Sequence, residues 1–343
     1  MRVLLTGAAG FIGQHVLHEL LVRGHEVSAI DSLRPDVHNN ATWSPPPGVR
    51  FAQVDVRDAA AIDPLLANID AVLHLAAKVG LGVDVQDLPD YASSNDAGTA
   101  VLLAAMAHAG VKRLTLASSM VVYGEGVGHC AEHGAIAPAP RAEAALSAGQ
   151  FEPLCPVCGR PLEPALVTEE AALDPRNAYA SSKVAQEFYA GNWARVTGGS
   201  VAVMRYHNVY GPGMPRDTPY AGVAAIFTSA LRRGEAPRVF EDGKQRRDFV
   251  HVRDIAAATV LACEKHETGV RAYNVGSGSP RTVGDMARAL AAALRGPEPV
   301  VTGGYRLCDV RHITADSSRL RREFGWMPRA DFEDGMTELA TSV

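Results

Sequence analysis

The chain has 343 residues and a formal net charge of −5 at pH 7, so it lacks the basic field that nucleic-acid binding proteins use. Its length exceeds that of a usual single core, which predicts a large domain and a smaller one. The most apolar stretches are short and rich in alanine, and the chain enters a core strand at once, which leaves no room for a signal peptide. We therefore expect a cytoplasmic protein with neither a nucleic-acid nor a membrane partner.

A short apolar run and three spaced glycines open the chain. Residues 3–5 predict a buried parallel strand, and Gly7, Gly10 and Gly13 lead directly into an amphipathic helix predicted over Phe11–Val22. These glycines permit a tight turn, the approach of a pyrophosphate to the backbone, and close packing of the helix on the strand. Because the N-terminus of a helix attracts anions, the stretch predicts a phosphate-binding turn.

A second predicted strand, residues 26–30, ends in Asp31, eighteen residues after Gly13. A carboxylate there accepts hydrogen bonds from an adenosine ribose and repels a 2′-phosphate, which favours NAD over NADP; the alternative is an ordinary turn with a helix-capping aspartate. Further strands are predicted at residues 49–54, 71–75, 113–117 and 200–205, with helical segments such as 99–109 between them. This alternation predicts an α/β fold with a Rossmann-type, doubly wound parallel sheet.

Two separated segments carry residues suited to acid–base chemistry. Ser119 lies at the end of the fifth predicted strand, and Tyr179 and Lys183 lie four residues apart at the head of a helix that ends near Arg195. On one helix face, the ammonium group of Lys183 favours the phenolate form of Tyr179. A serine hydroxyl nearby can share a substrate proton with the phenol, beside a hydride acceptor.

At this point the sequence resembles the extended short-chain dehydrogenase/reductases, and within them the nucleotide-sugar epimerases and dehydratases. The matching stretches are residues 6–13, 118–124, 179–183, 205–213 and 247–252. The resemblance implies that Ser119, Tyr179 and Lys183 are catalytic. It implies an NAD site at Gly7, Gly10, Phe11, Ile12, Gly13, Asp31, Asp55, Val56, Leu75, Ala76, Ala77, Asn95, Tyr179, Lys183 and Tyr206. It implies a nucleotide-diphosphate-sugar site at Lys78, Ser119, Met120, His207, Asn208, Arg247, Arg306 and Asp309.

The arginines of the substrate site also fit a diphosphate on their own chemistry. Guanidinium groups bind phosphate oxygens through paired hydrogen bonds, which suits Arg247 and Arg306. The alternative is that both are surface arginines paired with neighbouring aspartates. We expect the NAD-binding domain at residues 1–208 and a mainly sugar-nucleotide-binding domain at 209–343, with some late segments returning to the larger domain. Helices are predicted at 253–265 and 283–294, a strand at 272–275, and a substrate-covering loop at 211–220.

Departures from the family pattern narrow the expected reaction. Related dehydratases carry an Asp-Glu pair after the catalytic hydroxyl residue, where this chain has Met120 and Val121. Without an extra acid, the resemblance favours 4-epimerisation through a transient 4-keto sugar, with NAD regenerated. His207 replaces the phenylalanine of most relatives, so it is either a wall of the sugar pocket or an acid–base group for a C3/C5 epimerase or reductase. A non-catalytic dinucleotide sensor is the alternative of another class, although such proteins usually lack the tyrosine or the lysine.

An insert at residues 126–168 carries a possible metal site. Cys130 and His133, followed by Cys155 and Cys158, have the spacing of a zinc knuckle, which predicts a closed and therefore structural zinc site. Reduced thiols in a loop, or His129 as the fourth ligand, are the alternatives. The insert resembles one in a subgroup of dTDP-L-rhamnose 4-epimerases, and that reaction is the expected one; UDP-glucuronate or UDP-galactose 4-epimerisation comes second. The insert is expected to hang over the sugar pocket.

The resemblance also implies a homodimer. Relatives pair through the long helix after the fourth strand and the helix that bears the tyrosine and lysine. The candidate apolar faces are Val101, Leu102, Ala105 and His108 on the first helix, and Val184, Phe188 and Ala194 on the second.

Overall fold

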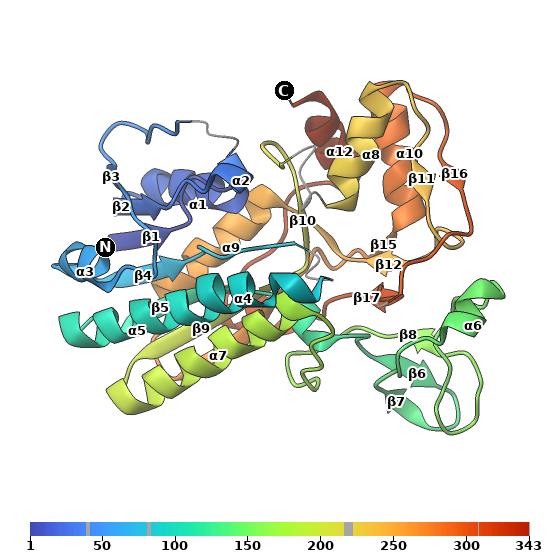
Figure 1. The fold of residues 1–343 in the computed structure, drawn as a ribbon, viewed down its shortest axis with the longest axis horizontal. Coiled ribbons are helices and arrows are strands. Elements are labelled where there is room, and N and C mark those ends of the chain that lie inside the picture. Colours follow the sequence, from blue (N-terminus) through green and yellow to red (C-terminus); the bar gives the residue numbers. More distant parts are fainter. Residues whose placement is uncertain (39–41, 81–83, 216–221, 308, 343) are drawn as a thin grey trace.

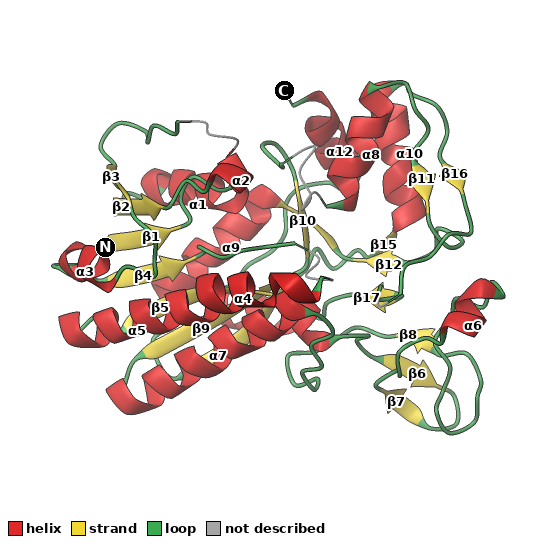
Figure 2. Cartoon of the chain, in the orientation of Figure 1, coloured by secondary structure: helices red, strands yellow, loops and turns green. Residues whose placement is uncertain are grey.

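A seven-stranded parallel sheet forms the centre of the larger half of the molecule (Figures 1 and 2). The computed structural model describes residues 1–38, 42–80, 84–215, 222–307 and 309–342, so Cys308 and residues 216–220 of the predicted covering loop lie outside the described residues. The strands, in sheet order, are β14 (Val270–Val275), β9 (Ser200–Tyr206), β5 (Arg113–Ser119), β4 (Ala71–His74), β1 (Arg2–Thr6), β2 (Glu26–Asp31) and β3 (Arg50–Gln53). The prediction of a Rossmann-type fold is confirmed.

Helices cover both faces of this sheet. Helices α1 (Phe11–Val22) and α9 (Val252–Lys265) pack on one face, and α5 (Gly98–Ala109) and α7 (Ala178–Thr197) pack on the other. The alternation of side chains along β1 shows why both faces are apolar: Val3 and Leu5 pack toward α1 and α9, whereas Leu4 joins the core under α5 and α7. The predicted strand 272–275 is part of β14, the edge of the same sheet.

The smaller half of the molecule is built from later segments (upper right in Figure 1). Its core lies among α8 (Val223–Arg232), α10 (Val283–Leu294) and α12 (Phe332–Thr341). The later part of the chain also contains short strand pairs: β10 (Asn208–Tyr210) with β13 (Phe249–His251), β11 (Arg238–Val239) with β16 (Val300–Val301), and β12 (Arg246–Arg247) between β15 (Arg281–Thr282) and β17 (His312–Ile313). Helix α11 (Ser318–Phe324) returns to pack beside β14.

The insert forms a separate lobe (lower right in Figure 1). It contains an antiparallel sheet in the order β7 (Gly134–Ile136), β6 (Gly128–Cys130) and β8 (Glu163–Pro164), and a short helix, α6 (Glu143–Ser147). Its small core consists of Cys130, Cys155 and Leu162, with Ile136 and Cys158 against it. A core of this size stabilises little by itself, so the lobe needs further links.

Part of the expected dimer face is wrong. Leu102, Ala105 and Ala194 are at most 5% exposed, because α5 and α7 turn these residues into the core of the same chain. Phe188, in contrast, is 67% exposed on α7. Within the described residues, we find no helix with the length and apolarity needed to cross a membrane.

Candidate functional site

The glycine-rich turn after β1 has the geometry of a phosphate cradle. Gly7 has a φ of +71°, and a Cβ atom there would lie 2.7 Å from the backbone nitrogen of Ala76 on the loop after β4. A Cβ atom at Gly13 would overlap the carbonyl oxygen of Gly7. Larger residues at these two positions would therefore displace the loop or push α1 away, so that the N-terminus of α1 would no longer face the sheet edge.

Asp31 is fixed at the end of β2. Its carboxylate accepts hydrogen bonds from the backbone nitrogens of Ala9 at 3.0 Å and Leu33 at 2.9 Å, and the residue is only 8% exposed. Nε2 of His38 lies 3.5 Å from Oδ1, and Oδ2 retains a further lone pair that can accept a ribose hydroxyl. Leu33 takes a left-handed conformation, with a φ of +51°, which turns the chain back over this strand end.

A cavity of about 390 Å³ runs along the carboxyl edge of the sheet from the glycine turn to α7. Its wall includes every predicted cofactor residue except Asn95, and the predicted substrate residue Lys78 as well. These residues are Gly7, Gly10, Phe11, Ile12, Gly13, Asp31, Asp55, Val56, Leu75, Ala76, Ala77, Lys78, Tyr179, Lys183 and Tyr206. The cavity therefore joins the two halves of the predicted NAD site.

Asn95 lies behind this wall, where it is fully buried. Its side-chain oxygen accepts from the backbone nitrogen of Lys78 at 2.7 Å, and its amide nitrogen donates to the Lys78 carbonyl at 2.9 Å and to the Ser182 hydroxyl at 2.8 Å. The structure thus places Asn95 as a link between the loop after β4 and the helix that bears Tyr179.

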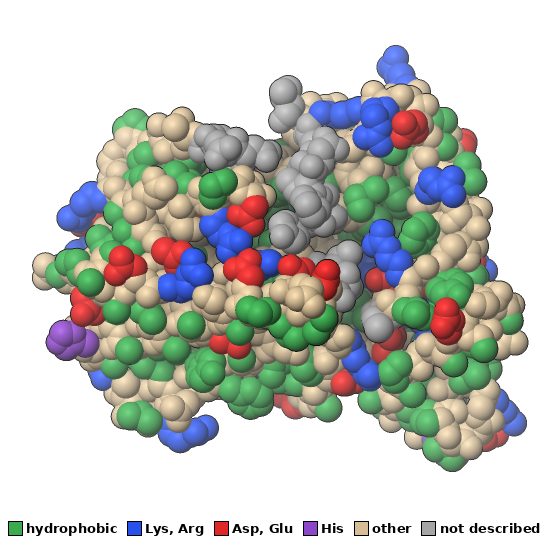
Figure 3. Space-filling view, viewed as in Figure 1, with side chains coloured by type: hydrophobic (Ala, Val, Ile, Leu, Met, Phe, Trp, Pro, Cys, Tyr) green, Lys and Arg blue, Asp and Glu red, His purple; other side chains and the backbone are tan. Residues whose placement is uncertain are grey.

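Charged pairs that the sequence analysis did not identify surround one end of the cavity. Arg34 donates both terminal nitrogens to the carboxylate of Asp90, each at 2.9 Å, and Lys78 donates to the same carboxylate at 2.8 Å. Asp36 is a further partner of Arg34. In Figure 3, acidic and basic side chains form a mixed band over this region, above α5. Because Arg34 is already paired, it is a poor site for a phosphate.

Two of the three predicted catalytic residues, Tyr179 and Lys183, line the other end of the cavity, and Ser119 is hydrogen-bonded to Tyr179. Asn177 caps the N-terminus of α7 by accepting from the backbone nitrogen of Ala180 at 2.8 Å, so Tyr179 lies in the first turn. The ammonium group of Lys183 lies 5.9 Å from the centre of the Tyr179 ring and donates to the Ala117 carbonyl at 2.8 Å. Ser119 is the last residue of β5, a strand on which α7 packs.

Burial controls the proton affinities of this group. Burial raises the pKa of Tyr179 to about 12, and a hydrogen bond with the Ser119 hydroxyl opposes the rise. Burial also lowers the pKa of Lys183 to about 8, while Glu187 acts in the opposite direction. At neutral pH the pair is therefore phenol and ammonium. A positive charge brought beside the phenol would favour loss of its proton.

Three of the residues expected to bind the substrate, Arg247, Arg306 and Asp309, belong to the later part of the chain. Arg247 donates to the carbonyls of Val310 at 2.6 Å and Arg311 at 3.0 Å. Burial raises the pKa of Asp309, whereas the charges of Arg247 and then Arg306 lower it, so these three charged groups lie near one another. Arg306 is exposed, and its guanidinium lies 5.2 Å from the centre of the Phe240 ring.

His207 and Asn208 follow β9 directly, and Met120 follows Ser119. His207 is 3% exposed, and among the described residues neither of its ring nitrogens has a hydrogen-bond partner of good geometry. The side-chain oxygen of Asn208 is likewise buried without a described partner. Buried polar atoms of this kind are costly unless a ligand or water satisfies them. Burial lowers the pKa of His207 to about 4, so its imidazole is neutral at pH 7.

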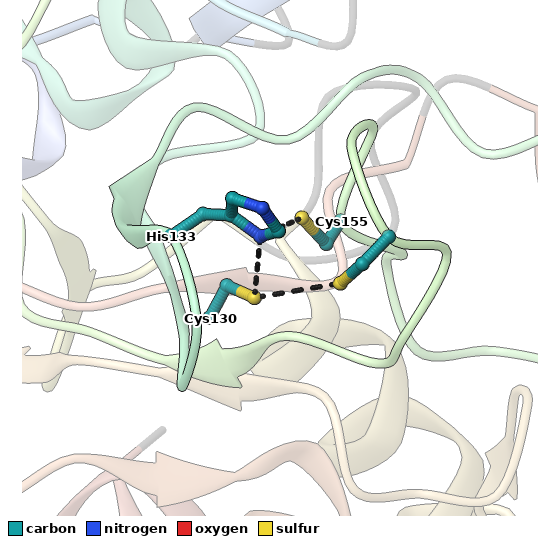
Figure 4. Close-up of side chains that lie close together, drawn as sticks. Cys130, His133 and Cys155 are labelled. Carbon is teal, nitrogen blue, oxygen red and sulfur yellow. Dashed lines mark hydrogen bonds between the residues drawn. The ribbon is translucent and has the colours of Figure 1, made fainter.

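The four predicted metal ligands of the insert converge. Their ligand atoms all lie within 4.8 Å of one another, and Figure 4 shows Cys130, His133 and Cys155 turned toward a common point. The Cys130 sulfur lies 3.6 Å from the Cys158 sulfur and 3.4 Å from Nδ1 of His133. His129, the alternative ligand, is exposed on β6 and lies outside this group.

These separations fit a tetrahedral zinc ion. Zn–S bonds of about 2.3 Å at tetrahedral angles place two sulfurs about 3.8 Å apart and a sulfur about 3.6 Å from a nitrogen. The sulfur of Cys155 lies 3.6 Å from Nδ1 of His133. Three sulfurs and one imidazole are also a donor set typical of zinc, so the residues fit the predicted metal.

Comparisons with known proteins agree with this geometry. The profile of the NAD dependent epimerase/dehydratase family matches residues 3–276, which confirms the resemblance found in the sequence. A dTDP-L-rhamnose 4-epimerase of Burkholderia thailandensis is 33% identical over 348 aligned residues, covering 100% of this chain and 94% of that protein. The structure is similar to UDP-glucose 4-epimerase of Thermotoga maritima with UDP-glucose, with a TM-score of 0.79, 28% identity, and coverage of 99% and 97%. It is also similar to UDP-glucose 4-epimerase of Thermus thermophilus with NAD, with a TM-score of 0.74, 30% identity, and coverage of 99% and 98%.

We expect NADP to bind more weakly than NAD, because a 2′-phosphate would lie against the Asp31 carboxylate while Arg34 is paired elsewhere. Repulsion between unit charges at about 4 Å costs about 1 kcal/mol in water and about 4 kcal/mol at a protein surface, which corresponds to a roughly five- to thousandfold loss of affinity. Calorimetry with both dinucleotides measures the ratio. Asp31→Asn should reduce it, and equal affinities for the unsubstituted protein would contradict the assignment.

Proposed function

The chain belongs to the NAD dependent epimerase/dehydratase family, and we propose that it is an NAD-dependent nucleotide-sugar 4-epimerase with dTDP-L-rhamnose as its substrate. The observation that carries the reaction type is that Tyr179 and Lys183 line the end of a cavity that begins at the glycine turn, with the Ser119 hydroxyl hydrogen-bonded to Tyr179. The substrate rests on the sequence similarity over the whole chain and on the cysteine-bearing insert.

The residues of the cavity fit NAD. The glycine turn and the N-terminus of α1 would hold its diphosphate, Asp31 would hold the adenosine ribose, and Tyr179 and Lys183 would lie at the nicotinamide end. When bound, NAD supplies the acceptor and donor of the hydride at the sugar C4. Asp309 and Arg306 would hold the nucleotide part of the substrate, with Arg247 fixing the backbone of their segment, so that the sugar alone is free to turn.

Tyr179 supplies the proton chemistry in this proposal. The phenolate form of Tyr179, which Lys183 and the positive charge of a bound nicotinamide ring would favour, would take the proton of the sugar hydroxyl and later return it, and the Ser119 hydroxyl shares the hydrogen bond. Lys183 lowers the cost of the phenolate through its positive charge and is held in place by the Ala117 carbonyl. Met120 and Val121 provide no carboxylic acid, so nothing at this position can protonate a departing hydroxyl as a dehydratase requires.

The state of His207 also favours inversion at C4 alone. A C3/C5 epimerase needs acid–base groups that exchange protons at carbon, and the neutral, buried imidazole of His207 is a poor acid at pH 7. As a wall of the sugar pocket, its unsatisfied nitrogens would instead hydrogen-bond sugar hydroxyls. The presence of both Tyr179 and Lys183 favours catalysis over a dinucleotide sensor.

Incubation with a panel of nucleotide sugars in deuterated water tests the reaction. We expect dTDP-L-rhamnose to equilibrate with its 4-epimer without incorporation of deuterium, because the same hydrogen leaves and returns. The panel includes UDP-glucuronate and UDP-galactose. Faster turnover of either one would show that it, and not dTDP-L-rhamnose, is the substrate. Deuterium at C3 or C5 would instead indicate the reaction that employs His207.

Tyr179→Phe is the matched control for this assay. Loss of the phenol oxygen should lower turnover by about 10²–10⁴-fold, the usual contribution of a general acid–base group, while bound NAD stays unchanged. A variant that equilibrates the epimers at nearly the original rate would show that Tyr179 is not the base.

We also propose that Cys130, His133, Cys155 and Cys158 bind one structural zinc ion. The sulfur–sulfur and sulfur–nitrogen separations support this, as does the small size of the core around them. With four protein ligands, no coordination position remains for a substrate, so the ion would hold the insert together rather than take part in the reaction.

Elemental analysis should find about one zinc per chain, as a single four-ligand site requires. The double variant Cys155→Ser, Cys158→Ser should lose the metal and bind nucleotide sugar less well, yet retain NAD, because the dinucleotide cavity lies outside the insert. His129→Ala is the matched control and should retain the zinc. Fully active protein without zinc would show that the four residues have no metal role.

Finally, we propose a homodimer formed through α5 and α7. These helices lie side by side along one edge of the molecule (Figure 1), and α7 exposes Phe188, Tyr189 and Val196 by 67%, 46% and 77%. Large apolar side chains exposed together on one face favour association.

Light scattering at micromolar concentration should give twice the chain mass. Phe188→Glu should shift the protein toward the monomer, because it places a charge in the apolar interface. Val22→Glu, a change at an equally exposed residue on α1, should leave the mass unchanged. A monomer in the unsubstituted protein would refute the proposal.

A further inference from the structure

One segment of the insert is attached to the smaller half of the molecule by buried charges. This segment, residues 141–152, is called the arm below; it contains α6 and lies between the two pairs of metal ligands in the sequence. Its first residue, Arg141, has a side chain that is 5% exposed. Arg141 donates to Glu241 at 2.9 Å, to the carbonyl of Asp309 at 2.7 Å, and to the carbonyl of Phe151 within the arm at 3.1 Å.

The other end of the arm holds the same region through Glu152. Its carboxylate accepts from the guanidinium of Arg311, whose side chain is completely buried, and from Nε2 of His312 at 2.8 Å. Arg311 also donates to Glu241 at 2.7 Å and to Asp242 at 2.8 Å. Two arginines thus share three carboxylates through directional, charge-assisted hydrogen bonds, which fix the relative positions of these groups.

The segment that the arm holds is the one that carries Arg306 and Asp309. Arg141 fixes the carbonyl of Asp309 from the side of the insert, while Arg247 fixes the carbonyls of Val310 and Arg311 from β12. A further contact joins the Ser147 hydroxyl of α6 to the Tyr305 hydroxyl at 2.7 Å. The backbone next to Asp309 is therefore held on both sides.

Strain at Glu241 indicates that this arrangement is specific. Glu241 has a φ of +51°, which is unfavourable for a residue with a side chain, and it is 3% exposed. Its two carboxylate oxygens accept from Arg141 and Arg311, one each, so the arginines of the arm and of the held segment share it. Such a conformation persists where the surroundings determine it.

We infer that Arg141 is a positioning residue for the nucleoside diphosphate of the substrate, acting through the segment that bears Asp309 and Arg306. The inference rests on the proposed function, which places the nucleotide against that segment. By this inference the insert is part of the substrate site. The two ends of the arm are brought together by Cys130 and His133 on one side and Cys155 and Cys158 on the other, so the arm belongs to the same lobe as this cluster. The side chain of Arg141 is satisfied by protein acceptors, so its effect on the nucleotide passes through its bonds to Glu241 and Asp309.

The test compares Arg141→Ala with Arg160→Ala, a matched control in the same insert. Arg160 is 66% exposed and pairs with Glu132 on the outer surface. Calorimetry with UDP and with dTDP measures nucleotide affinity without requiring turnover. We expect Arg141→Ala to weaken binding of the preferred nucleotide roughly tenfold, as loss of a positioning contact does, and to leave bound NAD and zinc unchanged. In the epimerase assay the same variant should raise KM far more than it lowers kcat.

Arg141→Lys keeps the positive charge but not the fork of donors, so it should recover only part of the nucleotide affinity. If Arg141→Ala does not fold, Arg141→Lys takes its place in the test. NAD content and melting temperature measure whether each variant is folded. Nucleotide affinities of the Arg141 variants equal to that of Arg160→Ala would overturn the inference. If the unsubstituted protein binds neither UDP nor dTDP, the proposed function itself fails. This outcome differs from equal affinities among the variants, which would overturn only the inference about Arg141.

Discussion

The parallel arrangement of the central strands determines where the chemistry of this protein lies. In a parallel sheet every strand ends at the same edge, so residues that are far apart in the sequence but follow strand ends must meet there. Gly7 after β1, Asp31 at the end of β2, Ala76 after β4 and Ser118 near the end of β5 line one cavity in this way. Helix α7 adds Tyr179 and Lys183 because it packs against β5 and β9 on one face.

This constraint explains why the cofactor half of the site could be predicted from the sequence. The strands are short apolar runs, the glycines are required by close backbone contacts, and Tyr179 and Lys183 are related by helical spacing. Each of these signals is local. The convergence of Cys130, His133, Cys155 and Cys158 was also predictable, since two pairs with short internal spacing need only one loop to meet.

The segment that bears Arg306 and Asp309, where we propose that the substrate binds, depends on contacts that no local pattern encodes. Arg141 meets Glu241 across 100 residues, and Glu152 meets Arg311 across 159. A charged residue in a stretch rich in alanine and proline is more often a solvated surface residue, so nothing marks Arg141 as buried. The error at the expected dimer face has a related cause. Helix α5 is apolar on all sides, so its sequence does not show which of its residues face the sheet.

The two halves of the site are consequently stabilised in different ways. The cofactor cavity is bounded by strands and helices that share the main hydrophobic core, so its shape follows from folding of the sheet. The segment bearing Arg306 and Asp309 has little regular structure and is fixed by guanidinium groups on backbone carbonyls and by shared carboxylates. Such contacts are directional and depend on every partner being present. A site built in this way can change its nucleotide or sugar preference through an insert while the dinucleotide core stays the same, which agrees with the family's use of one fold for several nucleotide sugars.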